Sequence, residues 1–414
     1  MIKRSVSHFS CFAAMLIAAI SPSAMAEVTT PSDVKVSALK QTTQTQTQNV
    51  ILITADGLRW QEVFRGLDKD MLTTQNEVKH PEDLLAQFDA ETTDARRARL
   101  MPFLWDHVAK NGQIFGNRDK GSIAHVTNTM WFSYPGYNEF LCGYPDDKNI
   151  TSNDKVLNPN ATVFEWLQAT PATKDRVAAF GAWDVFPYIF NAKRAGFPVD
   201  GGDVSFVPAS GTTPVMDVIN SMRETTPMRW GHAAVYDSMI YPMAAEYLKT
   251  NKPRALFIGL GETDEWGHEG NYGQYLQAAN RLDRWLKELW HITQSMPEYR
   301  DKTTFVFTTD HGRGDFRTGP TSWNHHGKSV PGAEEIFVAV WGPDTKPAGE
   351  LESGEVTQSQ VAATVAAALG YDLPAAQPKA APPISQALNA APSISKPLNG
   401  ESTEGKTSSL PAGK

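Results

Sequence analysis

The sequence predicts an α/β protein with a mostly parallel central sheet, helices on both faces and cap-like insertions, the architecture of strand–helix–strand units. Two observations predict it. Apolar, β-rich runs alternate with segments of helical periodicity. Aspartates also directly follow or lie close behind three of these runs, and ligands of such sheets bind beyond the carboxyl ends of the strands.

Each predicted strand is a short apolar run bounded by glycine or aspartate. The strands are expected at residues 49–55, 176–181, 255–260, 303–309 and 335–341. The helices are expected where apolar residues recur at helical spacing, at residues 101–110, 162–169, 234–249, 272–292 and 357–369. Gly370 ends the last helix, because glycine favours the position just beyond a helix.

Residues 1–26 are predicted to be a signal peptide. Lys3 and Arg4 precede an apolar core at residues 12–20, and Ala24 and Ala26 provide a small-x-small cleavage site. We therefore expect an exported protein, periplasmic or secreted, without a membrane anchor. Cleavage leaves Cys142 as the single cysteine, so no internal disulfide can form.

The expected catalytic domain spans residues 49–374. Residues 27–48 are rich in Thr, Gln and Ser and are expected to form a flexible lead-in. Residues 375–414, dominated by Ala, Pro, Ser and Lys, are expected to form a disordered tail. Residues 59–100 and 182–229 interrupt the alternation and are candidate insertions that line or cap a site.

The net charge argues against nonspecific binding of nucleic acid. It is −8 for the whole chain and −10 once Lys3 and Arg4 are removed with the signal. The sequence leaves the oligomeric state open.

Carboxylates and imidazoles at the strand ends suggest a metal site. Asp264 and His268 are four residues apart, so in a helix both side chains lie on one face and can hold one zinc ion. Asp310 and His311 are adjacent, so on an extended backbone they point in opposite directions and suit separate metals. Asp56 ends the first strand. Each motif alone has a structural alternative, such as a turn or a helix cap.

His325 and His326 form a histidine pair before Gly327. One of them is expected to be a ligand, and His326, next to the glycine, is the choice. The alternative is a solvated pair.

Ser133 is the candidate nucleophile, and its hydroxyl would need a base or a bound cation. Residues 134–137, Tyr-Pro-Gly-Tyr, predict a type II turn that presents Ser133 at the start of a helix. Thr127 and Thr129 are rival hydroxyls.

These residues together resemble the core of the alkaline phosphatase superfamily, especially its nucleotide pyrophosphatase/phosphodiesterase branch. The resemblance covers roughly residues 49–370 and is carried by Asp-x-x-Gly-His at 264–268, Asp-His-Gly at 310–312, the late His-Gly at 326–327 and Ser-Tyr-Pro at 133–135. It implies two zinc ions, one held by Asp264, His268 and His326, the other by Asp56, Asp310 and His311. Manganese or iron can occupy the same ligand types. Ser133 would form a phosphoseryl intermediate.

Some positions depart from the family pattern. Asn153 matches loosely an asparagine that contacts a phosphoryl oxygen, and Lys328 and Arg313 lie near ligands and are weak candidates for supplying positive charge. Tyr137 replaces the arginine that sulfatases need for formylglycine formation, which disfavours sulfatase chemistry.

The sequence thus predicts a metal-dependent hydrolase of small-molecule phosphate esters, with diesters slightly favoured. A phosphomonoesterase or phosphonate hydrolase would use the same ligands. An inactive metal-containing binding protein is an alternative of another class. A metal-independent serine hydrolase is disfavoured, because the chain lacks a Gly-x-Ser-x-Gly elbow around Ser133.

Overall fold

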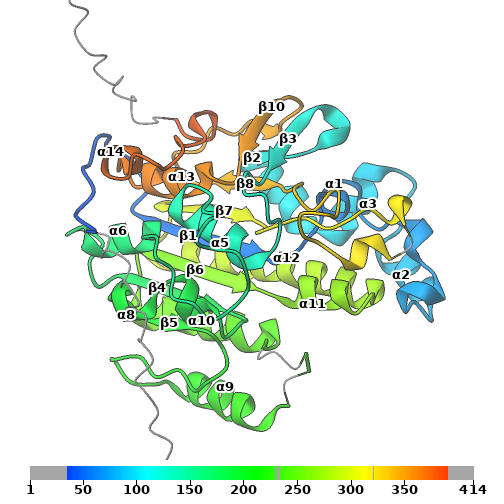
Figure 1. Ribbon diagram of the computed structural model, residues 1–414, viewed down its shortest axis with the longest axis horizontal. Helices are drawn as coiled ribbons and strands as arrows, with labels where there is room; N and C mark the ends of the chain where they lie inside the picture. Colours follow the sequence, from blue (N-terminus) through cyan, green and yellow to red (C-terminus); the bar gives the residue numbers. More distant parts are fainter. Residues whose placement is uncertain (1–34, 228, 231–233, 320, 390–414) are drawn as a thin grey trace, which may run out of the picture. The chain divides into compact units, whose positions relative to one another are not determined.

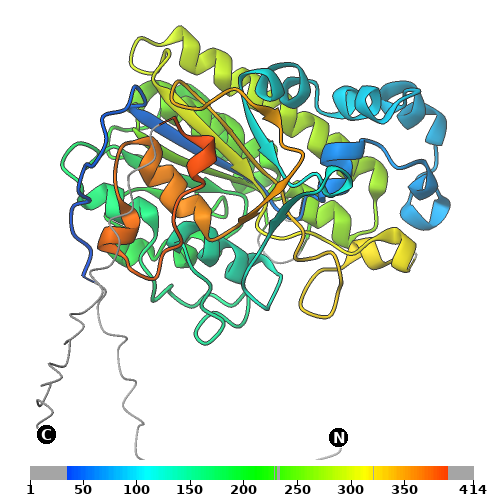
Figure 2. The same ribbon diagram turned by 90° about the horizontal axis from the view of Figure 1, so that it is seen from above.

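The computed structural model describes residues 35–227, 229–230, 234–319 and 321–389, which belong to one compact unit. The predicted signal peptide lies outside these residues. The α/β prediction is confirmed, since a large, mostly parallel sheet lies between helices (Figures 1 and 2).

The central sheet has eight strands in the order β5-β4-β6-β1-β7-β8-β2-β9. Its strands are β1 (Asn49–Ala55), β2 (Gly112–Phe115), β4 (Val177–Gly181), β5 (Val199–Asp200), β6 (Ala255–Leu260), β7 (Thr303–Thr308), β8 (Val338–Trp341) and β9 (Gly349–Glu350). Among the strands of the described residues, only β8 runs antiparallel to both of its neighbours, β7 and β2. A separate parallel pair joins β3 (Ser122–His125) to β10 (Gly354–Thr357).

The helices begin with three in the first candidate insertion, α1 (Trp60–Arg65), α2 (Pro81–Phe88) and α3 (Thr93–Leu100). The middle of the chain contributes α4 (Ala109–Asn111), α5 (Ser133–Cys142), α6 (Val163–Ala169), α7 (Phe186–Ile189), α8 (Ala192–Ala195) and α9 (Pro214–Thr225). The last group is α10 (Asp237–Asn251), α11 (Glu262–His268), α12 (Tyr272–Ser295), α13 (Gln360–Ala368) and α14 (Leu373–Ala376).

The two faces of the sheet build two separate cores. Along β1, Ile51 and Ile53 face a core with α10 and α12, whereas Val50 and Leu52 face a core with α5, α6 and α13. This alternation is the period of two that a strand imposes. Because both faces are covered, β1 is fully buried along its length.

The register of the central strands gathers their carboxyl ends at one edge. Ala55 of β1 pairs with Leu260 of β6, and Thr54 pairs with Thr308 of β7. The residues that follow these three strands therefore emerge close together, as parallel pairing predicts.

Most predicted elements lie where the periodicity placed them. Strands β1 and β6 have the predicted bounds, and α12 begins at the predicted residue. The expected strand at 335–341 begins only at Val338, and the expected helix at 357–369 begins at Gln360, because Thr357 pairs with His125 in the small sheet. The sequence did not predict β2, which is only four residues long.

The two candidate insertions differ in what they contact. Helices α1 and α3 of the first pack together and join the core on the α12 face. Residues 182–185, at the start of the second, instead line the cavity described below.

The ordered domain extends beyond both predicted limits. Leu39 is buried, and its N–H donates to Thr170 Oγ1 over 2.9 Å. The expectation of a disordered tail from residue 375 is wrong up to residue 389. Ala380 and Ile384 are buried, and the N–H of Ala381 donates to the Gly143 carbonyl over 2.8 Å. The segment is anchored by Ile384 as well as by the small side chains of Ala380 and Ala387, which are buried in the same core.

Within the described part of the chain, no helix is both long and apolar enough to cross a membrane.

Candidate metal centre and nucleophile

Asp56 leaves the end of β1 through a turn that only glycine makes easily. Gly57 has a φ of +58°, and its N–H donates to Asp310 Oδ1 over 3.1 Å. Asp56 Oδ2 accepts a hydrogen bond of 3.0 Å from the Tyr137 hydroxyl. The turn therefore ties the ends of β1 and β7 together and leaves Asp56 Oδ1 facing the site.

Asp264, His268 and His326 form a first group, named here the Asp264 cluster. Asp264 and His268 both lie on α11, with 3.1 Å between Asp264 Oδ2 and His268 Nε2. His326 Nε2 is 2.9 Å from His268 Nε2 and 3.8 Å from Asp264 Oδ1. These atoms lie within 4.8 Å of one another, close enough to share one metal ion.

Asp56, Asp310 and His311 form a second group, named here the His311 cluster. His311 Nε2 is 3.3 Å from Asp56 Oδ1 and 3.4 Å from Asp310 Oδ2. The other ring nitrogen, Nδ1, lies 2.8 Å from the Gly312 carbonyl oxygen, which only accepts, so Nδ1 carries a proton. Nε2 therefore faces carboxylates and needs either a second proton or a metal ion between them.

Asp264 also approaches the second group. Its Oδ1 atom is 3.9 Å from His311 Nε2, and ligand atoms of Asp56, Asp264 and His311 lie within 4.8 Å of one another. Asp310 offers a metal ion one oxygen, Oδ2, because its Oδ1 accepts the Gly57 N–H. The two clusters are thus adjacent, with Asp264 between them.

Burial and neighbouring charges shift the pKa values of several of these groups. Burial and the nearby Asp56 raise the pKa of Asp310 well above its usual range. Burial opposes the charged form of His311, but Asp310 and Asp56 outweigh it and raise the pKa of His311 to about 9. Burial also opposes ionisation of Asp264, yet the cations around it, with His268 first, hold its pKa well below the usual range.

The donor set fits bound metal ions. Asp56 Oδ1, Asp310 Oδ2 and His326 Nδ1 are buried atoms without a hydrogen-bond partner among the described residues. Buried polar atoms are rarely left unpaired, and several carboxylates packed together repel one another. Divalent cations would satisfy the carboxylates, and the mixture of imidazole and carboxylate suits zinc, manganese or iron.

Ser133 lies at the start of α5, beside the His311 cluster. Its side chain is buried, and its Oγ atom is 3.3 Å from His311 Nε2. Of the first N–H groups of this helix, that of Tyr134 donates to Asn153 Oδ1 and that of Gly136 to the Phe132 carbonyl, so the N–H of Ser133 is the one placed to favour an anion here.

The predicted turn at residues 134–137 is wrong, since these residues form the first part of α5. Proline is tolerated in a first helical turn, so Pro135 does not prevent the helix. Gly136 is needed for close packing and not for a positive φ, because a Cβ there would collide with the backbone carbonyl of Asp310. The helix bearing Ser133 therefore rests directly on Asp310, two residues after the end of β7.

The rival hydroxyls have other partners. Thr127 Oγ1 donates to the buried carboxylate of Glu139 over 2.8 Å, and Thr129 Oγ1 donates to Asp147 Oδ2 over 2.7 Å. Neither threonine lines the cavity that contains Ser133. The geometry therefore favours Ser133 as the nucleophile.

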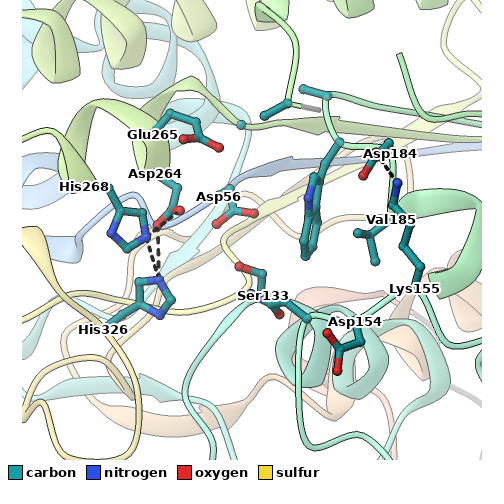
Figure 3. Close-up of a pocket in the computed structure, with 15 residues that line it drawn as sticks. Asp56, Ser133, Asp154, Lys155, Asp184, Val185, Asp264, Glu265, His268 and His326 are labelled. Atoms are coloured by element: carbon teal, nitrogen blue, oxygen red, sulfur yellow. Dashed lines mark hydrogen bonds and ion pairs between the residues drawn. The ribbon is translucent and has the colours of Figure 1, made fainter. Parts of the chain in front are cut away.

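A cavity of about 600 Å³ opens at the site. Figure 3 shows Asp264, His268 and His326 at one side of Asp56 and Ser133, with Asp154, Lys155 and Asp184 at the other. Trp183 also lines the cavity, and Lys155 pairs with Asp184. The sequence placed residues 182–229 near a site but did not single out Trp183 or Asp184, because nothing in their local pattern distinguishes them.

The remaining candidate residues differ in exposure and in whether they lie at the cavity. Asn153 lines the cavity, and its Oδ1 accepts the Tyr134 N–H over 2.9 Å, which holds its amide beside the start of α5. Lys328 is exposed and does not line the cavity, so the geometry gives it no support as a substrate contact. His325 is exposed, whereas the His326 side chain is 10% exposed and reaches the site.

Known proteins resemble this chain in sequence and in fold. Residues 233–373 match the model of the Metalloenzyme superfamily. GPI ethanolamine phosphate transferase 1 of Emericella nidulans is 23% identical over 364 residues, which cover 79% of this chain and 33% of that protein. The Homo sapiens protein of the same name is 23% identical over 236 residues, which cover 54% of this chain and 22% of that protein. This chain therefore spans a third or less of the length of these relatives.

The crystal structure of the alkaline phosphatase PafA has a similar fold, with a TM-score of 0.55. The likeness covers 84% of this chain and 99% of that one at 10% sequence identity, so it concerns the fold alone. The match of residues 233–373 and the likeness in fold agree with the sequence resemblance to the alkaline phosphatase superfamily. The nucleotide pyrophosphatase/phosphodiesterase branch is not singled out by these comparisons.

Proposed function

We propose that the protein is a two-metal phosphohydrolase that cleaves phosphate esters through a phosphoseryl intermediate on Ser133. The observation that carries the proposal is the position of the Ser133 hydroxyl, 3.3 Å from His311 Nε2 at the edge of two adjacent groups of candidate metal ligands. The Asp264 cluster would hold one ion, and the His311 cluster the other. Zinc is the proposed metal, with manganese or iron as alternatives.

The bound ions would supply Lewis acidity and lower the pKa of a nearby hydroxyl. The chain's own groups then orient the reaction. Ser133 Oγ gives up its proton and forms a bond to phosphorus as the ester P–O bond breaks, and the departing alkoxide takes up a proton. The backbone N–H of Ser133 and the side-chain amide of Asn153 are placed to donate to phosphoryl oxygens. Water then attacks phosphorus and releases Ser133.

The size of the cavity supports a phosphodiester as substrate. About 600 Å³ of space extends from Ser133 to the wall formed by Trp183, Asp184 and Lys155, which leaves room for a second ester group. Monoesterase or phosphonate activity on the same ligands is the nearest alternative. The signal-like residues 1–26 support export to a periplasmic or extracellular compartment.

The first test is metal content by mass spectrometry, together with hydrolysis of nitrophenyl phosphate monoester and diester substrates before and after chelation. We expect about two ions per chain, chelator-sensitive hydrolysis and a higher kcat/KM for the diester. Metal-loaded protein that hydrolyses neither substrate would favour the inactive binding protein instead.

A second test of the proposed function replaces the proposed nucleophile. Ser133→Ala should reduce turnover by at least about 10³-fold, because the covalent step is lost, while both metal ions remain bound. Thr129→Ala, which removes a hydroxyl outside the cavity, should keep wild-type activity. Turnover that survives in Ser133→Ala would instead point to attack by a metal-bound water.

A second candidate function is transfer of the phosphoryl-linked group to an alcohol acceptor. It is favoured by the names of the curated relatives, which are ethanolamine phosphate transferases, and by the carboxylate of Asp154 in the cavity wall, which suits an ammonium group. Hydrolysis in the presence of added ethanolamine or glycerol separates the two functions. A new phosphodiester product would support transfer, and products formed only with water would support hydrolysis.

A further inference from the structure

We infer that Arg313 is a positioning residue for the metal bound by the Asp264 cluster. Its buried guanidinium fixes both the carboxylate of Asp264 and the loop that carries His326. The inference rests on the proposed function, because it concerns the affinity of a metal site.

Arg313 links the two parts of the cluster that come from different segments. Its side chain is fully buried, and Nη1 contacts Asp264 Oδ1. Nε donates to the Trp323 carbonyl over 2.8 Å, and Nη2 donates to the Asn324 carbonyl. Trp323 and Asn324 end the short helix η6 (Ser322–Asn324), two residues before His326.

These contacts require the shape of a guanidinium. The carbonyls at the end of a helix have no partner inside the helix, so a buried helix end needs donors from elsewhere. Arginine presents several N–H groups in a rigid planar fork, which lets one side chain reach two carbonyls and a carboxylate at once. A lysine ammonium keeps the charge but cannot reproduce this geometry.

Two glycines of the metal motifs make room for this guanidinium. A Cβ at Gly267 would lie 2.7 Å from Arg313 Nε, and a Cβ at Gly57 would lie 2.9 Å from Arg313 Nη1. Gly267 is the glycine between Asp264 and His268 in the Asp-x-x-Gly-His motif. Its role is therefore steric, since its φ is not positive and α11 continues through it.

Arg313 orients the ligand carboxylate. With Oδ1 held by the guanidinium, Asp264 turns Oδ2 toward His268 Nε2, at 3.1 Å. The positive charge of Arg313 repels a cation, so its effect on metal affinity is the difference between orientation and repulsion. The inference is that orientation prevails, because the side chain also holds the His326 loop by two further hydrogen bonds. Loss of such outer partners typically weakens metal binding by about 10–100-fold.

The test compares metal binding by the full-length protein and by Arg313→Lys, with Arg59→Lys as the matched control. Arg59 is also a fully buried arginine and donates to a carbonyl of the same segment, that of Gly314, over 3.2 Å. It pairs with Glu62 and does not contact a residue of either cluster in the described structure. Titration of the metal-free protein with cobalt(II) reports the affinity and geometry of each site through its visible absorbance.

We expect Arg313→Lys to bind one of the two cobalt ions about 10–100-fold more weakly, with the other affinity unchanged, and Arg59→Lys to bind both as the wild type does. Gly267→Ala is a second variant that keeps every charge. Alanine is favoured over glycine inside a helix, so weaker binding of the same single ion would report the collision with Arg313. Far-UV circular dichroism confirms that each variant is folded.

Unchanged or tighter binding of both ions by Arg313→Lys and Gly267→Ala would overturn the inference. A different outcome, in which the wild-type protein itself binds no metal, would overturn the proposed function. Equal weakening of both ions in the Arg59→Lys control would show a general effect of losing a buried arginine, and would also overturn the positioning role.

Discussion

At the scale of single residues, the adjacent histidines His325 and His326 differ in exposure and contacts because of the tertiary structure. Both follow the short helix η6, and the sequence offers only the adjacent Gly327 to choose between them. In the structure His325 is exposed, whereas the His326 ring stacks on His311 with 3.9 Å between ring centroids. Extended backbone at His325 directs successive side chains to opposite sides.

This pair provides a matched experiment. His326→Ala should lose about one metal ion per chain and most of the activity, because it removes one of three ligands of the Asp264 cluster. His325→Ala should keep both ions. Metal content by mass spectrometry, normalised to folded protein, checks the prediction. Metal loss from His325→Ala, and not from His326→Ala, would reverse the assignment.

At the scale of secondary-structure elements, one buried carboxylate joins two helical segments. Asp283 of α12 is fully buried and accepts hydrogen bonds from the N–H groups of Phe103 and Leu104, over 2.7 and 2.9 Å. Burial raises the pKa of Asp283 to about 7, although these two N–H groups oppose the shift. The folded state thus binds this proton more tightly than the unfolded chain does.

The shift predicts how stability changes with pH. A carboxyl group with a raised pKa in the folded state stabilises the fold below its unfolded pKa of about 3.9, and this contribution disappears as pH rises to about 7. Between pH 4 and 7, the free energy of unfolding of the wild type should therefore fall relative to Asp283→Asn, by at most about 4 kcal/mol. Urea unfolding of both proteins at several pH values measures this difference. Parallel pH profiles would contradict it.

The predictability of the elements follows from their environment. The bounds of β1 and β6 were predicted because both strands are buried on both faces and their sequences are apolar throughout. The start of α5 was not, because the Pro-Gly pair at 135–136 resembles a turn. The helix forms there since Tyr134 and Tyr137 bury their rings in the core and Gly136 rests on the backbone of Asp310.

At the scale of the whole molecule, three strands direct acidic groups to one buried point. Asp56, Asp264 and Asp310 follow β1, β6 and β7, which are neighbours in the sheet. Burial and the charge of Asp56 already raise the pKa of Asp310 well above its usual range, which reflects this repulsion. Bound cations would remove it and stabilise the folded state by binding only that state.

Chelation should therefore lower the Tm of the wild type. The change in Tm caused by Asp310→Asn should have opposite signs in metal-free and in zinc-loaded protein. In metal-free protein, Asp310→Asn relieves repulsion at neutral pH and should raise the Tm by roughly 2 °C, which corresponds to about 1 kcal/mol. In the presence of excess zinc the same variant should have a lower Tm than the wild type, because a ligand is lost. Differential scanning calorimetry with and without chelator measures both values. A lower Tm for the variant in both conditions would mean that Asp310 serves mainly as the partner of the Gly57 N–H.

The sequence by itself determined the α/β class, the two strands β1 and β6 and the residue types of the site, because hydrophobic periodicity and the chemistry of Asp, His and Ser are local properties. Only the tertiary structure decided which groups meet. It turned His326 and not His325 toward Asp264, placed Asp264 between the two clusters, and buried Arg313 behind them. It also placed Trp183 and Asp184 in the lining of the cavity. These outcomes depend on strand register and on the packing of segments distant in the chain, which no local pattern contains.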